Sequence, residues 1–212
     1  MSFSKSIALI LMLASVLAAC TTKTVNTRFY TLANASQAKN QATNVTTATP
    51  IAIEVLPIKV PERLKRPQLV ITAKNSSQLK ILEQYRWSSS FNDELQDAFV
   101  SGITSQLGAI DISRGGRIVN QPTYRIAIVL QQFNATPSEQ VQANFGWTIT
   151  LLNAGTRSES RTLSCQITVS KMVANHTDAV VKGIQDAVSD AIQAISANVT
   201  SLNNGEEPKC SS

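Results

Sequence analysis

Three segments in the second half of the chain alternate between apolar and mostly polar side chains. Every second residue in each segment is apolar, and the residues between are mainly Gln, Asn, Thr and Ser. Such alternation is typical of a β-strand that is buried on one face only. The apolar positions are Tyr124, Ile126, Ile128 and Leu130, then Val141, Ala143, Phe145, Trp147, Ile149 and Leu151, and finally Leu163, Cys165, Ile167 and Val169. Because short turn-forming links join the segments, they are predicted to form an antiparallel meander with one buried and one solvated face.

Two other segments carry apolar residues at the three- and four-residue spacing of an amphipathic helix. The first is predicted to begin at Ser90, since Ser is a favoured N-cap, and to end at Gly108. The second runs from about Thr177 to Leu202. The apolar stripes are Phe91, Leu95, Ala98, Phe99, Ile103 and Leu107 in the first helix, and Val181, Ile184, Val188, Ala191, Ile195 and Val199 in the second. Both stripes are expected to face the core.

Shorter strands are predicted on either side of the first helix. Arg28–Leu32 is rich in aromatic and β-branched residues, and Ile51–Val55 alternates as a half-buried strand does. Gln68–Thr72 and Gln78–Gln84 flank a polar turn and are predicted to form a hairpin, and Ala109–Ser113 is predicted to be a short strand. The whole pattern predicts an α+β fold, in which a mostly antiparallel β-sheet has two α-helices packed on one face.

The start of the chain has the features of a secretory signal. Lys5 precedes an apolar run from Ile7 to Ala19, which is shorter than the ~20 residues that a membrane-spanning helix needs. The run ends in Leu17-Ala18-Ala19-Cys20, which resembles the lipobox of bacterial lipoproteins. That resemblance implies that Cys20 becomes the first mature residue and carries three acyl chains, which would hold a domain on a membrane. The alternative is an ordinary signal cleavage that a cysteine follows by coincidence.

The residue after the cysteine bears on the location. In the lipoproteins that this chain resembles, Asp at that position tends to retain the protein in the inner membrane, whereas this chain has Thr21. The resemblance therefore implies a lipid anchor on the periplasmic face of the outer membrane.

The chain is accordingly divided into four parts. Residues 1–19 are the predicted signal peptide, and residues 20–49 are a lipidated N-terminus with the short strand and a flexible segment. Residues 50–202 are predicted to form a single α+β domain, and residues 203–212 a C-terminal tail. A domain of this length is long enough to bury a sizeable core.

Two cysteines remain once Cys20 is used for the anchor. Cys165 and Cys210 can pair in an oxidising periplasm. The bridge would fasten the polar tail to the domain and stabilise it by about 4 kcal/mol in the chain-entropy model. The alternative is a buried free thiol at Cys165 and a second free thiol in the tail.

Charge and motif content favour neither nucleic-acid binding nor catalysis. The formal net charge of +5 is small and the basic residues are dispersed, whereas a nucleic-acid-binding protein typically has a clustered basic face. The single histidine, His176, lies beside a predicted helix start, where a capping or surface role is expected. The carboxylate pairs Asp93/Asp97 and Asp186/Asp190 are predicted to lie on solvated helix faces. We therefore expect no enzyme activity, no metal or other cofactor and no nucleic-acid partner.

One basic cluster is a better candidate for function. Arg and Trp are enriched at protein–protein hot spots, because both bury a large area and keep a polar group. The predicted contact with a subunit or partner consists of Arg63, Lys65, Arg66, Arg86 and Trp87. The alternative is a solvated loop beside a core tryptophan with a neighbouring salt bridge.

Several short motifs along the chain carry a family resemblance. They follow the lipobox in the order Phe29-Tyr30-Thr31-Leu32, Ile53-x-Val55-x-Pro57-Ile58-x-Val60-Pro61, Arg66-Pro67-Gln68-Leu69-Val70 and Arg86-Trp87. Together they resemble the PqiC/YmbA family of ABC-type transport auxiliary lipoproteins. The chain departs from that family at Arg63-Leu64-Lys65, where Tyr-Leu-Asp is common, and at Ser88-Ser89-Ser90, where an acidic residue and a proline are common.

This resemblance implies a function. The chain would be an outer-membrane lipoprotein subunit of an MCE-type intermembrane lipid transport system, and would support membrane integrity. Its partners would be an MCE-domain protein, whose periplasmic tube it docks, and further copies of itself in a homo-oligomeric ring. The competing hypotheses are a stand-alone periplasmic lipid-binding lipoprotein and a lipoprotein hydrolase.

Overall fold

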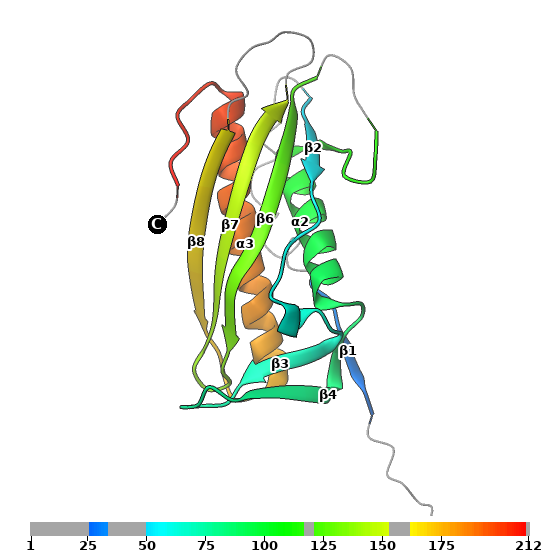
Figure 1. The fold of residues 1–212 in the computed structure, drawn as a ribbon, viewed down its shortest axis with the longest axis vertical. Coiled ribbons are helices and arrows are strands. Elements are labelled where there is room, and N and C mark those ends of the chain that lie inside the picture. Colours follow the sequence, from blue (N-terminus) through cyan, green and yellow to red (C-terminus); the bar gives the residue numbers. More distant parts are fainter. Residues whose placement is uncertain (1–25, 34–49, 117–120, 153–161, 211–212) are drawn as a thin grey trace, which may run out of the picture.

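The main sheet has five strands in the order β5-β2-β6-β7-β8 (Figure 1). This architecture comes from a computed structural model that describes residues 26–33, 50–116, 121–152 and 162–210. The strands β6 (Thr123–Ala135), β7 (Gln140–Leu152) and β8 (Thr162–Met172) form the antiparallel meander that the alternating pattern predicts. Trp147 lies opposite Ile128 on one side and Cys165 on the other, so the apolar faces of the three strands are in register.

The remaining strands of this sheet are short and parallel. β2 (Ala52–Val55) pairs in parallel with both β5 (Ile110–Asp111) and β6, so the sheet is mixed rather than purely antiparallel. The prediction of a half-buried strand is wrong at Ala52, which was expected on the open face but is as fully buried as Ile53. Both faces of β2 are therefore covered at that end, as is common for parallel strands.

Two helices pack on one face of the main sheet. They are α2 (Phe91–Leu107) and α3 (Thr177–Asn203), with the ends that the sequence predicts to within one residue. Gly108 follows α2 with φ 59°, a left-handed conformation that glycine adopts without strain. α3 packs on β6, β7 and β8, and α2 packs beside it against β2 (Figure 1). All apolar positions predicted for the two helical stripes are buried in one common core.

A second, smaller sheet lies across one end of the molecule. It has the order β1-β4-β3, made of β1 (Arg28–Tyr30), β3 (Gln68–Thr72) and β4 (Leu79–Trp87) (Figure 1, lower end). The predicted hairpin is confirmed in β3 and β4, which are antiparallel. The predicted α+β fold is confirmed, although its strands form two sheets rather than one. The chain still pairs with β6 at Lys59, two residues after Pro57, and leaves the main sheet after that bridge. Pro61 and Pro67 follow, and proline cannot donate to a β-ladder.

The C-terminal tail is fastened to the meander. Cys165 of β8 and Cys210 form a disulfide, and their Sγ atoms are 2.01 Å apart. The Asn198 amide of α3 also donates to the Lys209 carbonyl at 3.1 Å. The predicted signal peptide, Cys20 and most of the segment that is predicted to be flexible lie outside the described residues. Among the helices that are described, none is both long and apolar enough to cross a membrane.

Candidate functional site

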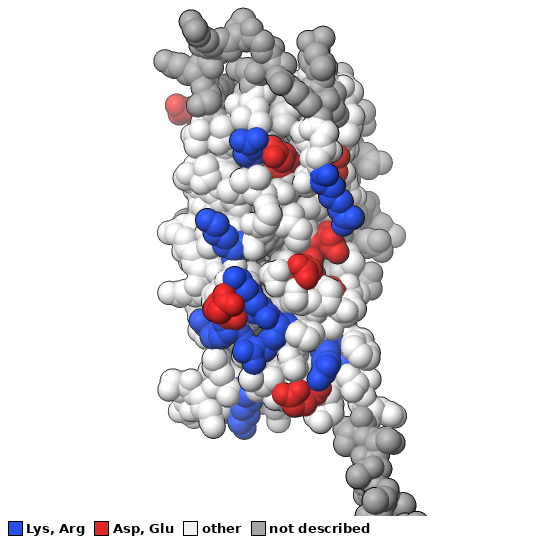
Figure 2. All heavy atoms as spheres, turned by 45° about the vertical axis from the view of Figure 1, so that its right-hand side comes forward, with Lys and Arg blue, Asp and Glu red and all other residues white. Residues whose placement is uncertain are grey.

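The predicted partner-contact residues lie close together where β3 and β4 meet. Arg63 belongs to a short 3₁₀ turn, η3 (Glu62–Leu64), and Lys65 and Arg66 follow it. Arg86 lies on β4 opposite Gln68, and Gln68 is two residues after Arg66 in the sequence. We call Arg63, Lys65, Arg66 and Arg86 the basic surface. Figure 2 shows basic side chains gathered on this side of the molecule, with acidic side chains among them.

Each exposed cation of the basic surface has a local acceptor. Lys65 Nζ lies 2.8 Å from a Glu62 carboxylate oxygen, and Arg86 Nη2 lies 3.5 Å from that of Glu83. Arg63 Nη2 donates to the Phe133 carbonyl at 3.4 Å. Ion pairs this exposed contribute only about 0–1 kcal/mol to stability, because water screens them. A partner that offers better-placed carboxylates can therefore take over these cations at little cost to the fold.

Arg66 and the neighbouring Trp87 are less exposed to solvent than Arg63 and Lys65. Arg66 is half-buried, and no described residue accepts a hydrogen bond from its buried Nε. Trp87 is only 3% exposed, and its ring packs against Phe91 at 5.3 Å between centroids. Trp87 is therefore a core residue, as the alternative of a core tryptophan has it. That it lies near a partner contact stays a prediction.

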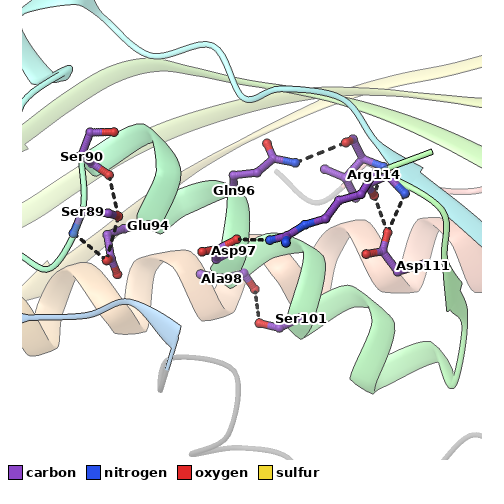
Figure 3. A network of polar contacts seen from close by, with 11 residues as sticks. Ser89, Ser90, Glu94, Gln96, Asp97, Ala98, Ser101, Asp111 and Arg114 are labelled. Atoms are coloured by element: carbon purple, nitrogen blue, oxygen red, sulfur yellow. Dashed lines mark hydrogen bonds and ion pairs between the residues drawn. The ribbon is translucent and has the colours of Figure 1, made fainter.

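Beside the basic surface, the carboxylate of Glu94 binds the N-terminal segment to the domain. Oε2 accepts from Thr31 Oγ1 and the Leu32 amide, both at 2.9 Å. Oε1 accepts from Ser88 Oγ at 2.5 Å, from Ser89 Oγ at 3.0 Å and from the Ser89 amide at 3.2 Å. Figure 3 shows Glu94 on α2 with Ser89 pointing toward it. We call these five residues the Glu94 clasp.

The clasp keeps a buried charge stable. Glu94 is only 6% exposed. Burial alone would raise its pKa, but the hydrogen bonds from Ser88, Leu32, Thr31 and Ser89 together lower the pKa below its ordinary value of 4.5. Hydrogen bonds to an ionised group are stronger than those between neutral groups, which is why five donors outweigh the loss of water. Glu94 is therefore an anion at neutral pH.

A second set of contacts fastens the same segment to α3. The Tyr30 hydroxyl donates to Asp178 at 2.6 Å, and Arg28 lies 3.7 Å from the same carboxylate. The Gln185 amide donates to the Thr31 carbonyl at 2.9 Å. Burial, followed by the bond to Asp178, raises the pKa of Tyr30 to about 12. Residues 28–32 are therefore held by both helices as well as by β4.

These contacts were not predicted, although the sequence holds a weak signal for one of them. Glu94 lies three residues after Phe91 and one before Leu95, at the margin of the apolar stripe of α2. A carboxylate at that margin, just after the run Ser88-Ser89-Ser90, has hydroxyl donors within reach. Asp178 and Gln185 give no comparable signal, because they lie far from their partners in the sequence.

The other residues considered for chemistry have separate roles. His176 caps α3, since its Nδ1 accepts from the Ala179 amide at 3.1 Å. Asp97 pairs with Arg114 at 3.4 Å (Figure 3), and Asp190 pairs with Lys171 at 2.5 Å. Within the described ranges, no three His, Cys, Asp or Glu residues come together as metal ligands would.

An open groove of about 850 Å³ runs between α2 and the chain that follows β2. Its apolar walls include Val55, Ile58 and Val100. Gln96 crosses its floor, accepting from the Ile58 amide at 3.0 Å and donating to the Val55 carbonyl at 3.2 Å. The amide of Gln96 thus holds the segment after β2 against α2.

Comparison with known proteins gives a family match and several matches to solved structures. The model of a family described as "ABC-type transport auxiliary lipoprotein component" matches residues 30–196. A crystal structure of an uncharacterized protein is similar with a TM-score of 0.61 at 15% identity, covering 82% of this chain and 99% of that one. A crystal structure of a Xanthomonas campestris protein of the DUF330 family has a TM-score of 0.54 at 16% identity, covering 74% and 88%. None of the curated proteins matches the chain.

Proposed function

The chain belongs to the ABC-type transport auxiliary lipoprotein family, and on that basis we propose that it is a non-enzymatic, outer-membrane subunit of an MCE-type lipid transport system. The match runs from Tyr30 to Ser196, through almost all of the domain, and it confirms the resemblance to PqiC/YmbA lipoproteins. This match is the observation that carries the proposal. In this function the protein docks the periplasmic tube of an MCE-domain protein and so supports membrane integrity.

The N-terminal contacts suit a protein that is held by a lipid. Cys20 would carry the acyl chains, and the chain from Cys20 to Arg28 spans at most about 28 Å when fully extended. Tyr30, Thr31 and Leu32 are bound to Asp178, Gln185 and Glu94. A pull on the anchor is therefore transmitted to both helices rather than to a loose end.

The basic surface suits the docking of a partner. Arg63 and Lys65 are exposed, and their local acceptors contribute little to the fold. Arg63 also borders a hollow of about 540 Å³ between the β3–β4 hairpin and the β6–β7 turn.

Charge reversal tests the docking. The double variant Arg63→Glu/Lys65→Glu should lose at least about tenfold in capture of the MCE-domain protein from membranes, since like charges across an interface cost several kcal/mol. Lys182→Glu is the matched control, because Lys182 is also exposed and also pairs with a carboxylate one helical turn away, that of Asp186. Capture that is equal for the wild type and both variants would remove the basic surface from the proposal.

The groove beside α2 favours one alternative. Its volume lies in the range of ligand-binding clefts, and Val55, Ile58 and Val100 give it apolar lining among polar side chains, as a lipid-binding lipoprotein acting alone could use. Native mass spectrometry of the protein released from membranes separates the two functions. A monomer with one co-purified lipid would support the alternative, whereas a lipid-free protein that captures the MCE partner supports the transport subunit.

A further inference from the structure

The exposed apolar side chains of the described residues are concentrated at one end of the molecule. Large hydrophobic residues that are well exposed are Phe29, Leu79, Ile81, Ile110 and Met172. Phe29 lies on β1 and Leu79 and Ile81 lie on β4, so all three belong to the small sheet at the lower end of Figure 1. Single exposed residues are ordinary on a protein surface, but several at one end indicate a contact.

The fourth residue of the group joins this end through the main sheet. Met172, which is 82% exposed, lies opposite Gln140 beside the β6–β7 turn. Lys74 of the β3–β4 turn lies 3.8 Å from Glu139 of the β6–β7 turn, which brings the two turns together. We call Phe29, Leu79, Ile81 and Met172 the apolar end. Ile110 does not belong to it, because it pairs with Ala52 at the opposite end of the main sheet.

The N-terminal segment leads away from the same end. β1 is part of the small sheet and pairs with the last residues of β4, Tyr85 to Trp87. The chain outside β1 has at most about 28 Å to reach Cys20. A bilayer that holds Cys20 therefore lies within that distance of Arg28, which precedes Phe29 of the apolar end, while the body of the main sheet extends away from it.

The charges of this end also suit a lipid surface. Lys80 lies between Leu79 and Ile81 on β4 and is exposed. A lysine can keep its ammonium group at the level of lipid headgroups while its methylene groups lie along apolar surface. Arg28 and Lys74 are further exposed cations here, each with one carboxylate nearby.

Taking Cys20 as the anchor, which is part of the proposed function, we propose that the apolar end rests on the membrane surface. Phe29, Ile81 and Met172 insert among the lipid headgroups, and Lys80 faces the phosphates. This contact fixes the orientation of the domain, with β6, β7 and β8 extending from the membrane. The short anchor favours a lipid surface over a protein as the occupant of this end.

Quenching by brominated phospholipids tests the contact. The mature chain is coupled through the Cys20 thiol to a maleimide phospholipid in vesicles, since Cys165 and Cys210 are already bridged. Ile81→Trp and Ile110→Trp are compared, because both positions are 43% exposed and they lie at opposite ends. Trp87 and Trp147 are present in both variants and give the same background.

The added tryptophan at position 81 should lose about half of its emission to brominated lipids, since interfacial side chains lie about 5–10 Å into the headgroup region. The one at position 110 should lose almost none. Equal, weak quenching of both variants would overturn the proposal. The proposal would also be overturned if lipid quenches position 81 only weakly and this position becomes buried only at high protein density. That result would favour contact between copies of the chain. Met172→Trp provides the same test if Ile81→Trp does not give the native circular dichroism spectrum.

The coupling imposes the anchor chemically. Loss of acylation or of partner capture in cells would therefore count against the proposed function and leave this result unchanged. A chain that is acylated in cells but shows no quenching on vesicles would overturn the membrane contact alone.

Discussion

The Glu94 clasp and the basic surface lie next to each other, but the charge of the clasp is buried and those of Arg63 and Lys65 are exposed. The Glu94 carboxylate is 6% exposed and accepts five hydrogen bonds from four residues. Arg63 and Lys65 are exposed, and within the described part of the chain each has one acceptor at its charged group. The buried charge is therefore part of the fold, whereas the exposed charges remain available to a partner. Removing the first should change stability, and removing the second should change binding.

The largest effect on stability is expected from Glu94→Ala. Five donors lose their acceptor, and buried unsatisfied donors are costly, so the free energy of unfolding should fall by about 3 kcal/mol. Asp93→Ala is the neighbouring control, because Asp93 is exposed. Urea unfolding measures both. Equal, small losses for the two variants would mean that the clasp does not stabilise the domain.

The clasp also makes stability depend on pH. The folded pKa of Glu94 is lowered, so the stability that its charge contributes is fully present above the unfolded value, near 4.5, and is lost as pH falls through the folded pKa. Urea midpoints measured from pH 7 to pH 3 should fall more steeply for the wild type than for Glu94→Gln. Parallel curves would contradict the lowered pKa.

A smaller effect is expected at the contact with α3. Asp178→Asn removes the charge that faces Tyr30 and Arg28, and should cost about 1 kcal/mol. The phenol pKa, raised to about 12 in the wild type, should fall toward 10. In the wild type the raised pKa stabilises the fold below pH 10, and this contribution is lost as pH rises through 12. Absorbance titration of the phenolate, with Tyr30→Phe to assign the signal, measures the shift.

The smallest effect on stability is expected at the basic surface. Arg63→Ala and Lys65→Ala should each change the free energy of unfolding by less than about 1 kcal/mol, because exposed pairs contribute little. Thermal unfolding measures this, with Glu94→Ala as the destabilised reference. A loss as large as that of Glu94→Ala would show that these cations belong to the fold, and would end the contrast between the two regions.

Regular patterns made much of the fold predictable. Tyr124, Phe145 and Cys165 each belong to a segment in which every second residue is apolar, and Phe91 and Leu95 follow a helical spacing. The meander and both helices could therefore be predicted from local sequence. The pairing of β2 with β5 and β6, and the separation of the small sheet, depend on contacts between distant segments. A periodic pattern shows which face of a strand is buried, but not which strand lies beside it.

The candidate site was predictable only in part. The β3–β4 hairpin places Arg86 opposite Gln68, close in sequence to Arg66, while the partner contact at Arg63, Lys65, Arg66 and Arg86 stays a prediction. Trp87 is a residue of β4 whose side chain lies in the core. The sequence alone could not distinguish a buried tryptophan from one that lies at an interface. The Glu94 clasp depends on β1 lying beside the start of α2, which no local pattern indicates.

Photocrosslinking in cells tests the account most directly. A photoreactive residue replaces Arg63, a second variant carries it at Lys182, and the mass of the exported N-terminus is read from the same cells. The account predicts three acyl chains on Cys20 and a crosslink to an MCE-domain protein from position 63 but not from position 182. An unacylated N-terminus, or crosslinks to an MCE-domain protein from neither position, would contradict it.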